Sequence, residues 1–450
     1  MNERARFGRL GTILVTAGSA VGLGNIWRFP YMTGHDGGAA FLIVYFFCIL
    51  LLGIPGMVAE FVVGRHGASN AARAFAGITP SGFWRWLGYL GVLTSMLILS
   101  FYSVVAGWCL QYMFASIGGG VSGELSQATS YFHDFSSGFL RPSLMAVAFI
   151  LITHWVVVKG VRNGIEKVSN VLMPVFFVLL VALVIASCLL PGAGRGIAFL
   201  LKPDFGQINS SIVIDALGQS FFSLSLGTAC LCTYSSYFGR STNLQKTAVQ
   251  IALIDTLIAI LAGLMIFPAA FAVGVNPDSG PALIFITLPS VFQKAFASVP
   301  LVGYLVSVAF YVLLVLAALT STISMHEIGT VFFREEFSIS RGKAAAIETA
   351  VCCLLAVLCA LSVGAVPGLS IGRDTLMDFL NNLTSDYLLP IGSFFTCLLV
   401  GWLAPRKLVK DEFTNWGTVS QHIYKVWLFM VRIVSPVCIL AVFLHQLHLL

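Results

Sequence analysis

Two stretches of the chain place groups suited to ion binding inside long apolar segments. The first is GSAVGLGNIWRFP, residues 18–30, which has three glycines within seven residues, followed by Asn25 and Arg28. Glycine and asparagine are poor helix formers. Lipid tolerates an unpaired backbone group only where that group lines a cavity or meets a partner. A helix broken here would offer free carbonyls to a cation and free amides to an anion.

The second stretch is QSFFSLSLGT, residues 219–228, where hydroxyls and a glycine again replace the expected apolar side chains. Many secondary transporters build a substrate and ion site near the bilayer midplane from two such broken helices. The two stretches therefore predict one site shared by both halves of the chain. Close helix packing is an alternative explanation for Gly18 and Gly22. It does not account for Gly24, Asn25 or Arg28.

These motifs lie in a polytopic membrane protein. The chain has 450 residues, of which 58% are hydrophobic and only 10% are charged, whereas soluble domains carry about 25% charged residues. The mean hydropathy is +0.92. Runs of about 20 apolar residues indicate membrane spans, and we expect eleven, at residues 10–33, 39–63, 86–115, 142–160, 167–190, 213–238, 247–274, 300–332, 344–363, 376–402 and 424–448.

Lysine and arginine are distributed unequally between the two sides that these spans define. Eighteen fall on the side of the N-terminus and five on the other. Positive charge accumulates in cytoplasmic loops, so we expect a cell membrane protein with a cytoplasmic N-terminus and an external C-terminus. The net charge of +6 follows from this bias and gives no reason to expect a nucleic-acid partner.

The chain resembles the neurotransmitter:sodium symporters. Residues 18–30 match their first-span signature, and residues 223–227 (SLSLG) resemble their sixth-span motif. Further similarities are Gly37–Phe41, Phe285–Pro289 and Leu319–Ser321. The resemblance implies an all-α polytopic protein of the LeuT type, a five-plus-five inverted repeat with helices 1 and 6 broken. One transporter domain, 1–450, would comprise a first repeat at 10–190, a second at 213–402 and an additional helix at 424–448.

The resemblance also implies two sodium ions. The first site would use the carbonyl of Ala20, the side chains of Asn25, Ser223 and Asp255, and the carboxylate of the substrate. The second would use the positions Gly18, Val21, Ala317, Thr320 and Ser321.

Asp255 stands where chloride-dependent members have asparagine, and Ala259 stands where they have serine. A carboxylate inside a membrane is costly unless it is paired, and a fixed charge there removes the need for chloride. We therefore expect sodium dependence without chloride dependence. As alternatives, Asp255 reaches the cytoplasmic surface or carries a proton.

Gly22 indicates the class of substrate, because monoamine-transporting relatives have an aspartate at this position. A chain without that acid needs a substrate that brings its own carboxylate. Backbone amides near Leu23 and Gly24 and the hydroxyl of Tyr102 would hold it. The whole substrate pocket would comprise Ser19, Ala20, Leu23, Gly24, Ile98, Tyr102, Phe222, Ser223, Ser225, Thr228, Ser321 and Met325.

Thr228 stands where some relatives that prefer small aliphatic substrates have phenylalanine, and Met325 is pliable. We therefore expect a neutral L-amino acid with a large hydrophobic or aromatic side chain. The sequence leaves the exact amino acid, the ion stoichiometry and the oligomeric state open.

The resemblance further implies gates on both sides of the site. Arg28 and Asp378 match an external pair, with Phe222 as an apolar lid, and Glu335 matches the cytoplasmic acid, whose basic partner would be Arg4 or Arg6. These features predict symport by alternating access. A proton-coupled transporter and a non-transporting sensor of the same fold remain alternatives. An enzyme is not expected, because the histidines are scattered and only His326–Glu327 is an adjacent acid–base pair.

Overall fold

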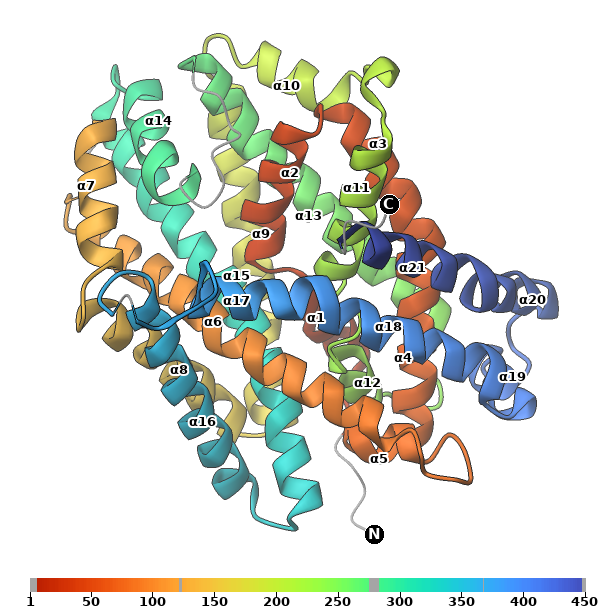
Figure 1. Cartoon of the computed structure of the whole chain (residues 1–450). Coiled ribbons are helices and arrows are strands. Elements are labelled where there is room, and N and C mark those ends of the chain that lie inside the picture. Colours follow the sequence, from red (N-terminus) through yellow and green to blue (C-terminus); the bar gives the residue numbers. More distant parts are fainter. Residues whose placement is uncertain (1–5, 121–123, 275–282, 367, 447–450) are drawn as a thin grey trace.

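The computed structural model describes residues 6–120, 124–274, 283–366 and 368–446. Within them the chain is almost entirely helical (Figure 1). The strands found in these ranges are β1 (Ser370–Ile371) and β2 (Asp374–Thr375), which form a short antiparallel hairpin. The all-α expectation is therefore confirmed.

Nine helical segments in the described part of the chain are long and apolar enough to cross a membrane. They coincide with nine of the eleven expected spans: Ala39–Gly67, Arg85–Ile117, Arg141–Val158, Val161–Cys188, Leu244–Ala272, Pro300–Glu336, Arg341–Ser362, Leu376–Leu403 and Gln421–Gln446. The two remaining expected spans, the first and the sixth, are present as interrupted helices. Neither span has a continuous helix long enough to cross a membrane, because each helical piece is short.

The first span consists of α1 (Arg9–Ala20), the π-helix η1 (Gly24–Arg28) and α2 (Phe29–His35). The helix ends at Ala20 because Val21 adopts an extended conformation with φ −74° and ψ 110°. In the sixth span, α11 (Ser210–Ser223) and α12 (Cys230–Ser235) are separated by a segment in which Ser225, Gly227 and Ala229 have positive φ. L-residues in that region cannot continue a right-handed helix. Both expected breaks are therefore confirmed.

The other spans are continuous and several contain single π-turns, a geometry often found at functional sites. Their elements are α3 (Ala39–Cys48), η2 (Ile49–Gly53), α4 (Ile54–Gly67), α6 (Arg85–Ile117), α8 (Arg141–Val158), η3 (Val161–Glu166), α9 (Lys167–Cys188), α13 (Leu244–Ala272), α15 (Pro300–Glu336), α16 (Arg341–Ser362), α17 (Leu376–Asn382), η6 (Leu383–Leu388), α18 (Leu389–Leu398), η7 (Leu399–Leu403), α20 (Gln421–Phe429), η8 (Met430–Val434) and α21 (Ser435–Gln446).

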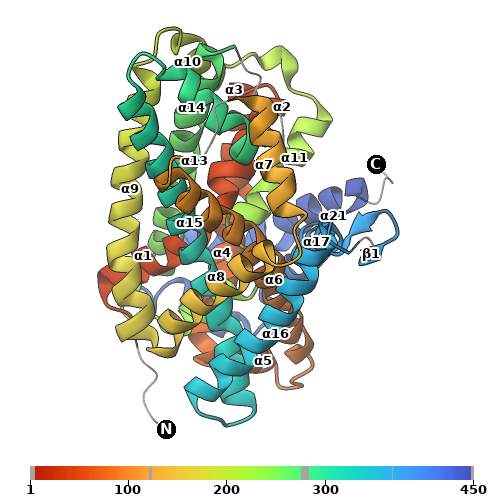
Figure 2. The ribbon, with the colours of Figure 1, turned by 90° about the vertical axis from the view of Figure 1, so that its left-hand side faces the viewer.

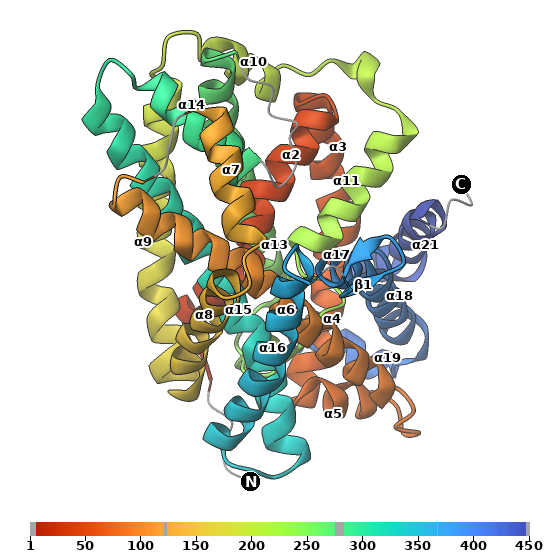
Figure 3. The same cartoon turned by 60° about the vertical axis from the view of Figure 1, so that its left-hand side comes forward.

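Short helices connect the spans at both ends of the bundle. They are α5 (Ala71–Ala76), α7 (Leu125–Ser136), α10 (Gly194–Leu201), η4 (Phe205–Gln207), η5 (Leu283–Thr287), α14 (Leu288–Ala295) and α19 (Arg406–Phe413). Figures 1 to 3 show α10 and α5 at opposite ends of the molecule. The two ends of the bundle are therefore called the α10 end and the α5 end.

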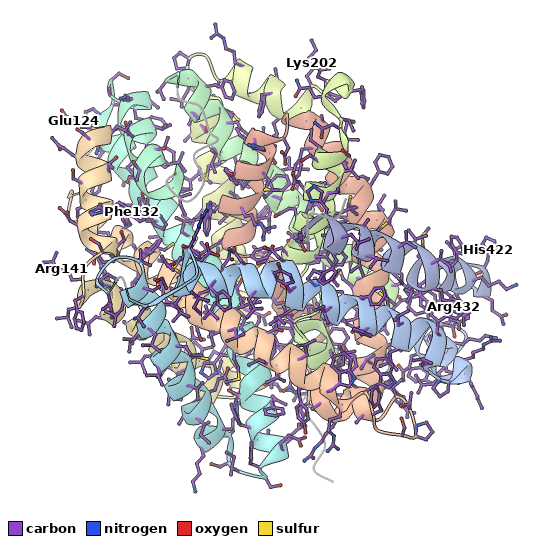
Figure 4. All side chains as sticks on the ribbon, in the orientation of Figure 1. Glu124, Phe132, Arg141, Lys202, His422 and Arg432 are labelled. Atoms are coloured by element: carbon purple, nitrogen blue, oxygen red, sulfur yellow. The ribbon has the colours of Figure 1, made fainter. Side chains whose placement is uncertain are left out.

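The interrupted first span lies inside the bundle. Its α1 contacts α15, α9 and α13, while α6, α8, α15 and α16 pack on one another as a group (Figures 2 and 3). Several polar side chains instead reach the outer edge of the molecule, as Glu124, Lys202 and His422 do in Figure 4. The protein thus surrounds its broken helix with continuous ones.

Candidate functional site

A buried carboxylate joins the first break to the sixth and seventh spans. Asp255 on α13 is 0% exposed. Its Oδ1 accepts a hydrogen bond of 2.7 Å from Asn25 Nδ2, and its Oδ2 accepts one of 2.8 Å from Ser223 Oγ. Tyr45, which the sequence did not indicate, also donates to Oδ2 at 3.2 Å. Three of the four residues expected at the first sodium site are therefore in direct contact. The fourth, Ala20, is the last residue of α1.

The second expected sodium site lies on the other side of the same break. Thr320 Oγ1 on α15 lies 2.9 Å from the Ala317 carbonyl and 3.3 Å from the Val21 carbonyl. Ser321 Oγ donates to Val21 O at 3.2 Å. Gly18 faces the same helix, since a Cβ on it would lie 3.5 Å from Thr320 Cβ. The structure brings all five residues together, and their donor atoms are all oxygens, as hard cations prefer.

An amide and a phenol mark the place where a carboxylate would bind. The N–H of Leu23, freed by the break, donates to Tyr102 Oη at 2.9 Å. Gly22 beside it has no room for a side chain, because a Cβ would lie 2.5 Å from Ser321 Oγ and 2.9 Å from Tyr102 Oη. A side chain at position 22 would therefore require Ser321 or Tyr102 to move. The amide of Gly22 is satisfied by Asn25 Oδ1 at 3.0 Å.

The break of the sixth span is held by polar contacts from three other spans. Ser225 Oγ donates to the Ser19 carbonyl at 3.4 Å, and Ser95 Oγ on α6 donates to the Thr228 carbonyl at 2.7 Å. Glu60 on α4 accepts the Gly227 N–H at 2.7 Å. The sequence analysis missed Glu60, although a carboxylate inside an apolar span is itself a signal of function or pairing.

Most of the remaining side chains expected in the substrate pocket are buried at this level of the bundle. Ser19, Ile98, Thr228 and Ser321 are each less than 5% exposed, whereas Met325 and Phe222 are partly exposed. His326 and Glu327 do not form an acid–base pair. His326 contacts Thr330 and Thr349, and Glu327 accepts from Tyr237 and Arg341.

A cavity of about 320 Å³ opens directly above the first break. Four expected pocket residues, Leu23, Gly24, Tyr102 and Phe222, line it together with both expected gate residues. The Arg28 guanidinium lies 4.4 Å from the centroid of the Phe222 ring. Asp378 instead accepts a hydrogen bond of 2.7 Å from Thr375. Within the described residues no hydrogen bond or ion pair joins Asp378 to Arg28, so that pairing stays a prediction.

The α5 end is closed by the N-terminal segment. Phe7 packs edge-on against Tyr234 and Tyr237, with ring centroids 5.8 and 5.4 Å apart, and Gly8 N–H donates to Glu166 at 2.9 Å. A second cavity, of about 570 Å³, lies beside this segment and is lined by Arg6 and Phe7 among others.

Glu335, the expected acid of this gate, accepts the Asn70 N–H at 2.6 Å, and its carbonyl accepts from Arg73. Of its two candidate basic partners, Arg4 lies outside the described residues. The side chain of Arg6 is exposed, and its carbonyl accepts from Arg162 at 2.9 Å. The role of Glu335 as a gate and its basic partner therefore stay predictions.

Comparisons with known proteins agree with this geometry. The model of the sodium:neurotransmitter symporter family matches residues 4–127 and 126–450. The chain is 37% identical over 450 residues to an uncharacterized sodium-dependent transporter, YhdH, of Bacillus subtilis, covering 98% of this chain and 97% of that protein. It is 33% identical over 456 residues to an uncharacterized sodium-dependent transporter of Haemophilus influenzae, covering 98% and 97%.

A solved structure is also similar. The crystal structure of MhsT in complex with L-phenylalanine superposes with a TM-score of 0.89, at 39% identity, over 99% of this chain and 100% of that chain. Fold and site thus define a sodium-dependent membrane transporter with the LeuT-type fold. The chain belongs to the sodium:neurotransmitter symporter family. Family and fold are those of transporters, not enzymes.

Proposed function

We propose that this protein carries a neutral L-amino acid across the cytoplasmic membrane together with two sodium ions, by alternating access and without chloride. The observation that carries this proposal is the surroundings of Gly22. The freed Leu23 amide and the Tyr102 hydroxyl suit a carboxylate, and the missing side chain at Gly22 leaves that carboxylate to the substrate. A substrate without a carboxylate would have no group to place beside the Leu23 amide and the Tyr102 hydroxyl.

The ammonium group of the substrate would lie on the opposite side, near the break of the sixth span. The acceptors proposed for it are the carbonyls around Phe222 and Ser225 and the Ser321 hydroxyl. The Phe222 carbonyl accepts from the Ser225 N–H at 3.1 Å and the Ser225 carbonyl from Thr228 Oγ1 at 2.7 Å, and a carbonyl oxygen can accept a second hydrogen bond. The bound phenylalanine of MhsT, a structure similar over almost the whole chain, supports a large hydrophobic or aromatic side chain. Thr228 leaves more room there than a phenylalanine would, and Met325 is pliable.

Chloride independence rests on Asp255. A buried charge needs a nearby opposite charge, and within the described residues no lysine or arginine forms an ion pair with this carboxylate. A sodium ion in contact with Asp255 and Asn25 would neutralise the charge of the carboxylate, and the carboxylate would neutralise the charge of the ion. An added anion would then be superfluous, because the carboxylate already supplies the negative charge that chloride provides elsewhere.

The proposed mechanism uses both cavities. Sodium holds the broken first span against α13 and α15, the amino acid fills the space above it, and the outer cavity closes. Opening of the α5 end then requires Phe7 to leave Tyr234 and Tyr237. The bias of positive charge supports a cytoplasmic position for that end and an external C-terminus.

Uptake into proteoliposomes tests the proposal. Labelled phenylalanine, tryptophan, leucine, methionine and glycine are offered separately with inward gradients of sodium, of potassium or of protons. We expect sodium alone to drive uptake, with phenylalanine, tryptophan or leucine preferred over glycine. Uptake driven by protons alone would favour proton coupling. Sodium-dependent binding without uptake of any of these amino acids would favour a sensor.

A further inference from the structure

A small cavity lies where four spans meet beside the break of the sixth. Its volume is about 10 Å³, and its lining includes Glu60 from α4, Leu226 from the break, Ser393 from α18 and Ser435 from α21. Each of these four residues is at most 5% exposed. None of the described residues that line it also lines the outer cavity above the first break. It is therefore a separate site in the interior of the bundle.

Three polar atoms of the residues that line this cavity have no hydrogen-bond partner in the described part of the chain. They are Glu60 Oε2, Ser393 Oγ and Ser435 Oγ. The other oxygen of the Glu60 carboxylate, Oε1, accepts the Gly227 N–H at 2.7 Å. Buried polar atoms in proteins are nearly always hydrogen-bonded, so each exception needs an explanation. Three exceptions around one cavity indicate a polar ligand that all three share.

Gly227 places two of these groups next to each other. Its N–H meets Glu60, and a Cβ on it would lie only 3.0 Å from Ser393 Oγ. Gly227 also has a φ of +82°, a conformation that side chains rarely allow. The carboxylate of the second span and the hydroxyl of the tenth therefore both approach this one glycine of the break.

The eleventh span supplies the third group. Ser435 begins α21, which packs on α18 (Figure 1). The same span is fixed to α4 beside the cavity, because Trp427 Nε1 donates to the Pro55 carbonyl at 3.1 Å and Gly56 lines the cavity. The position of Ser435 at the cavity is thus set by packing and by a hydrogen bond to the span that carries Glu60.

Size and chemistry decide what the ligand is. A volume of about 10–15 Å³ holds one water molecule, and a buried water makes about three hydrogen bonds. Water donates to a carboxylate and either donates to or accepts from a hydroxyl, as these three atoms require. Hard cations such as Ca²⁺ and Mg²⁺ take about six or more oxygens, twice the number of unpartnered oxygens that the described residues offer here.

We propose that this cavity binds one structural water molecule, which hydrogen-bonds to Glu60, Ser393 and Ser435 and ties the tenth and eleventh spans to the break of the sixth. The water completes the contact between Glu60 and Gly227, because it satisfies the carboxylate oxygen that Gly227 leaves unpaired. It also gives the eleventh span, which follows the second expected repeat, a link to the segment between Ser225 and Thr228. The site does not depend on which substrate the protein carries.

A crystal structure of the full-length protein at a resolution that shows ordered water tests the site directly. We expect one density peak about 2.6–3.2 Å from Glu60 Oε2, Ser393 Oγ and Ser435 Oγ. A cavity without density, or a direct hydrogen bond between Glu60 and one of the serines in its place, would overturn the proposal. An anomalous peak at this position in crystals grown with thallium in place of sodium would also overturn it, because it would assign a monovalent cation.

Serine-to-alanine variants test the same site in solution, with the melting temperature of the purified full-length protein as the measurement. Ser393→Ala and Ser435→Ala each remove one partner of the water, so we expect each to lower the melting temperature by about 1–3 °C. The double variant should fall by less than the sum of the two decreases, because both hydroxyls bind the same water.

Ser187→Ala is the matched control. Ser187 Oγ on α9 is also buried without a described hydrogen-bond partner, but Ser187 is not among the described residues that line this cavity. Removing it should leave the melting temperature unchanged or raise it, because an unpaired buried hydroxyl only costs stability. Unchanged or higher melting temperatures for Ser393→Ala and Ser435→Ala, additive decreases in the double variant, or an equal decrease in Ser187→Ala would each overturn the shared water.

Discussion

Asn25 Nδ2 lies 2.7 Å from Asp255 Oδ1 and thereby ties the break of the first span to the seventh. The same amide nitrogen lies 3.3 Å from the backbone carbonyl of Asp255, and the side-chain oxygen Oδ1 of Asn25 accepts from the Gly22 N–H at 3.0 Å. One side chain therefore determines both the shape of the break and the position of the buried carboxylate. Asn25 thus contacts Asp255 of the proposed sodium site and the Gly22 amide beside the proposed substrate site, which would give a physical route for coupling between them.

Replacing Asp255 by asparagine keeps the size of the side chain but removes its charge. A hydrogen bond to a charged group contributes about 1.5–3 kcal/mol, so we expect the sodium concentration for half-maximal uptake to rise by about 10- to 100-fold. Chloride should now stimulate the variant, because an anion beside Asn25 and Ser223 would restore the lost charge. Wild-type uptake should be unchanged when gluconate replaces chloride. Wild-type uptake that is lost when gluconate replaces chloride would contradict chloride independence.

Replacing Gly22 by alanine places a methyl group 2.5 Å from Ser321 Oγ. Overpacking of this kind costs about 1–3 kcal/mol, and the methyl group would occupy the proposed carboxylate position. We expect a lower melting temperature and at least about 10-fold weaker phenylalanine binding, measured by scintillation proximity. Gly218→Ala on α11 is the matched control, since nothing lies within 4 Å of the methyl group that it would add. Equal losses in both variants would argue against a specific role for Gly22.

Glu60 holds the break of the sixth span through a hydrogen bond from the Gly227 amide. Glu60→Ala leaves that buried N–H without its acceptor, which costs about 1–3 kcal/mol, whereas Glu60→Gln retains an acceptor. We expect the alanine variant to melt at a lower temperature and to transport slowly, and the glutamine variant to stay close to wild type. Equal melting temperatures and uptake rates for the two variants would show that the Glu60 contact is not structural.

Glu412 on α19 connects the tenth span to the α5 end of α4. Burial alone would raise the pKa of Glu412. A hydrogen bond with His66 and the nearby Arg65 guanidinium together lower this pKa below its ordinary value. Arg65 Nε lies 2.6 Å from Glu412 Oε2. A lowered pKa in the folded state adds stability above the ordinary carboxylate pKa of about 4.3, and that stability is lost as the pH falls through the folded-state pKa.

We therefore expect the melting temperature of the detergent-solubilised protein to fall as the pH is lowered below about 5. The Glu412→Gln variant should be less stable than wild type at pH 7, because the buried Arg65 loses its partner. Its melting temperature should also change less over the acidic range. A Glu412→Gln variant with the same acid-induced decrease as wild type would assign that decrease to other carboxylates.

The breaks were predictable from sequence because glycines and hydroxyls are conspicuous in an apolar span. Asn25 and Asp255 stand out for the same reason, since polar groups inside a membrane need partners. The length of each span was also predictable, because bilayer thickness fixes it. What these signals cannot give is which partner a polar group meets across the bundle.

Asp378 illustrates that difficulty. Its carboxylate accepts a hydrogen bond from Thr375, the residue that caps α17. This contact has no strong sequence signal, because a threonine near a helix start is compatible with many partners. Tyr45 was missed for a related reason: aromatic residues in a span are common, and only tertiary packing brings this hydroxyl to Asp255.

Concentrative uptake tests the central claim most directly. Proteoliposomes loaded with potassium are diluted into sodium or potassium medium containing labelled phenylalanine, and the internal concentration is followed over time. Coupled symport predicts that only the sodium gradient raises the internal concentration above the external one, and that a sodium ionophore collapses this accumulation. Internal phenylalanine that merely equals the external concentration in both media would contradict the account.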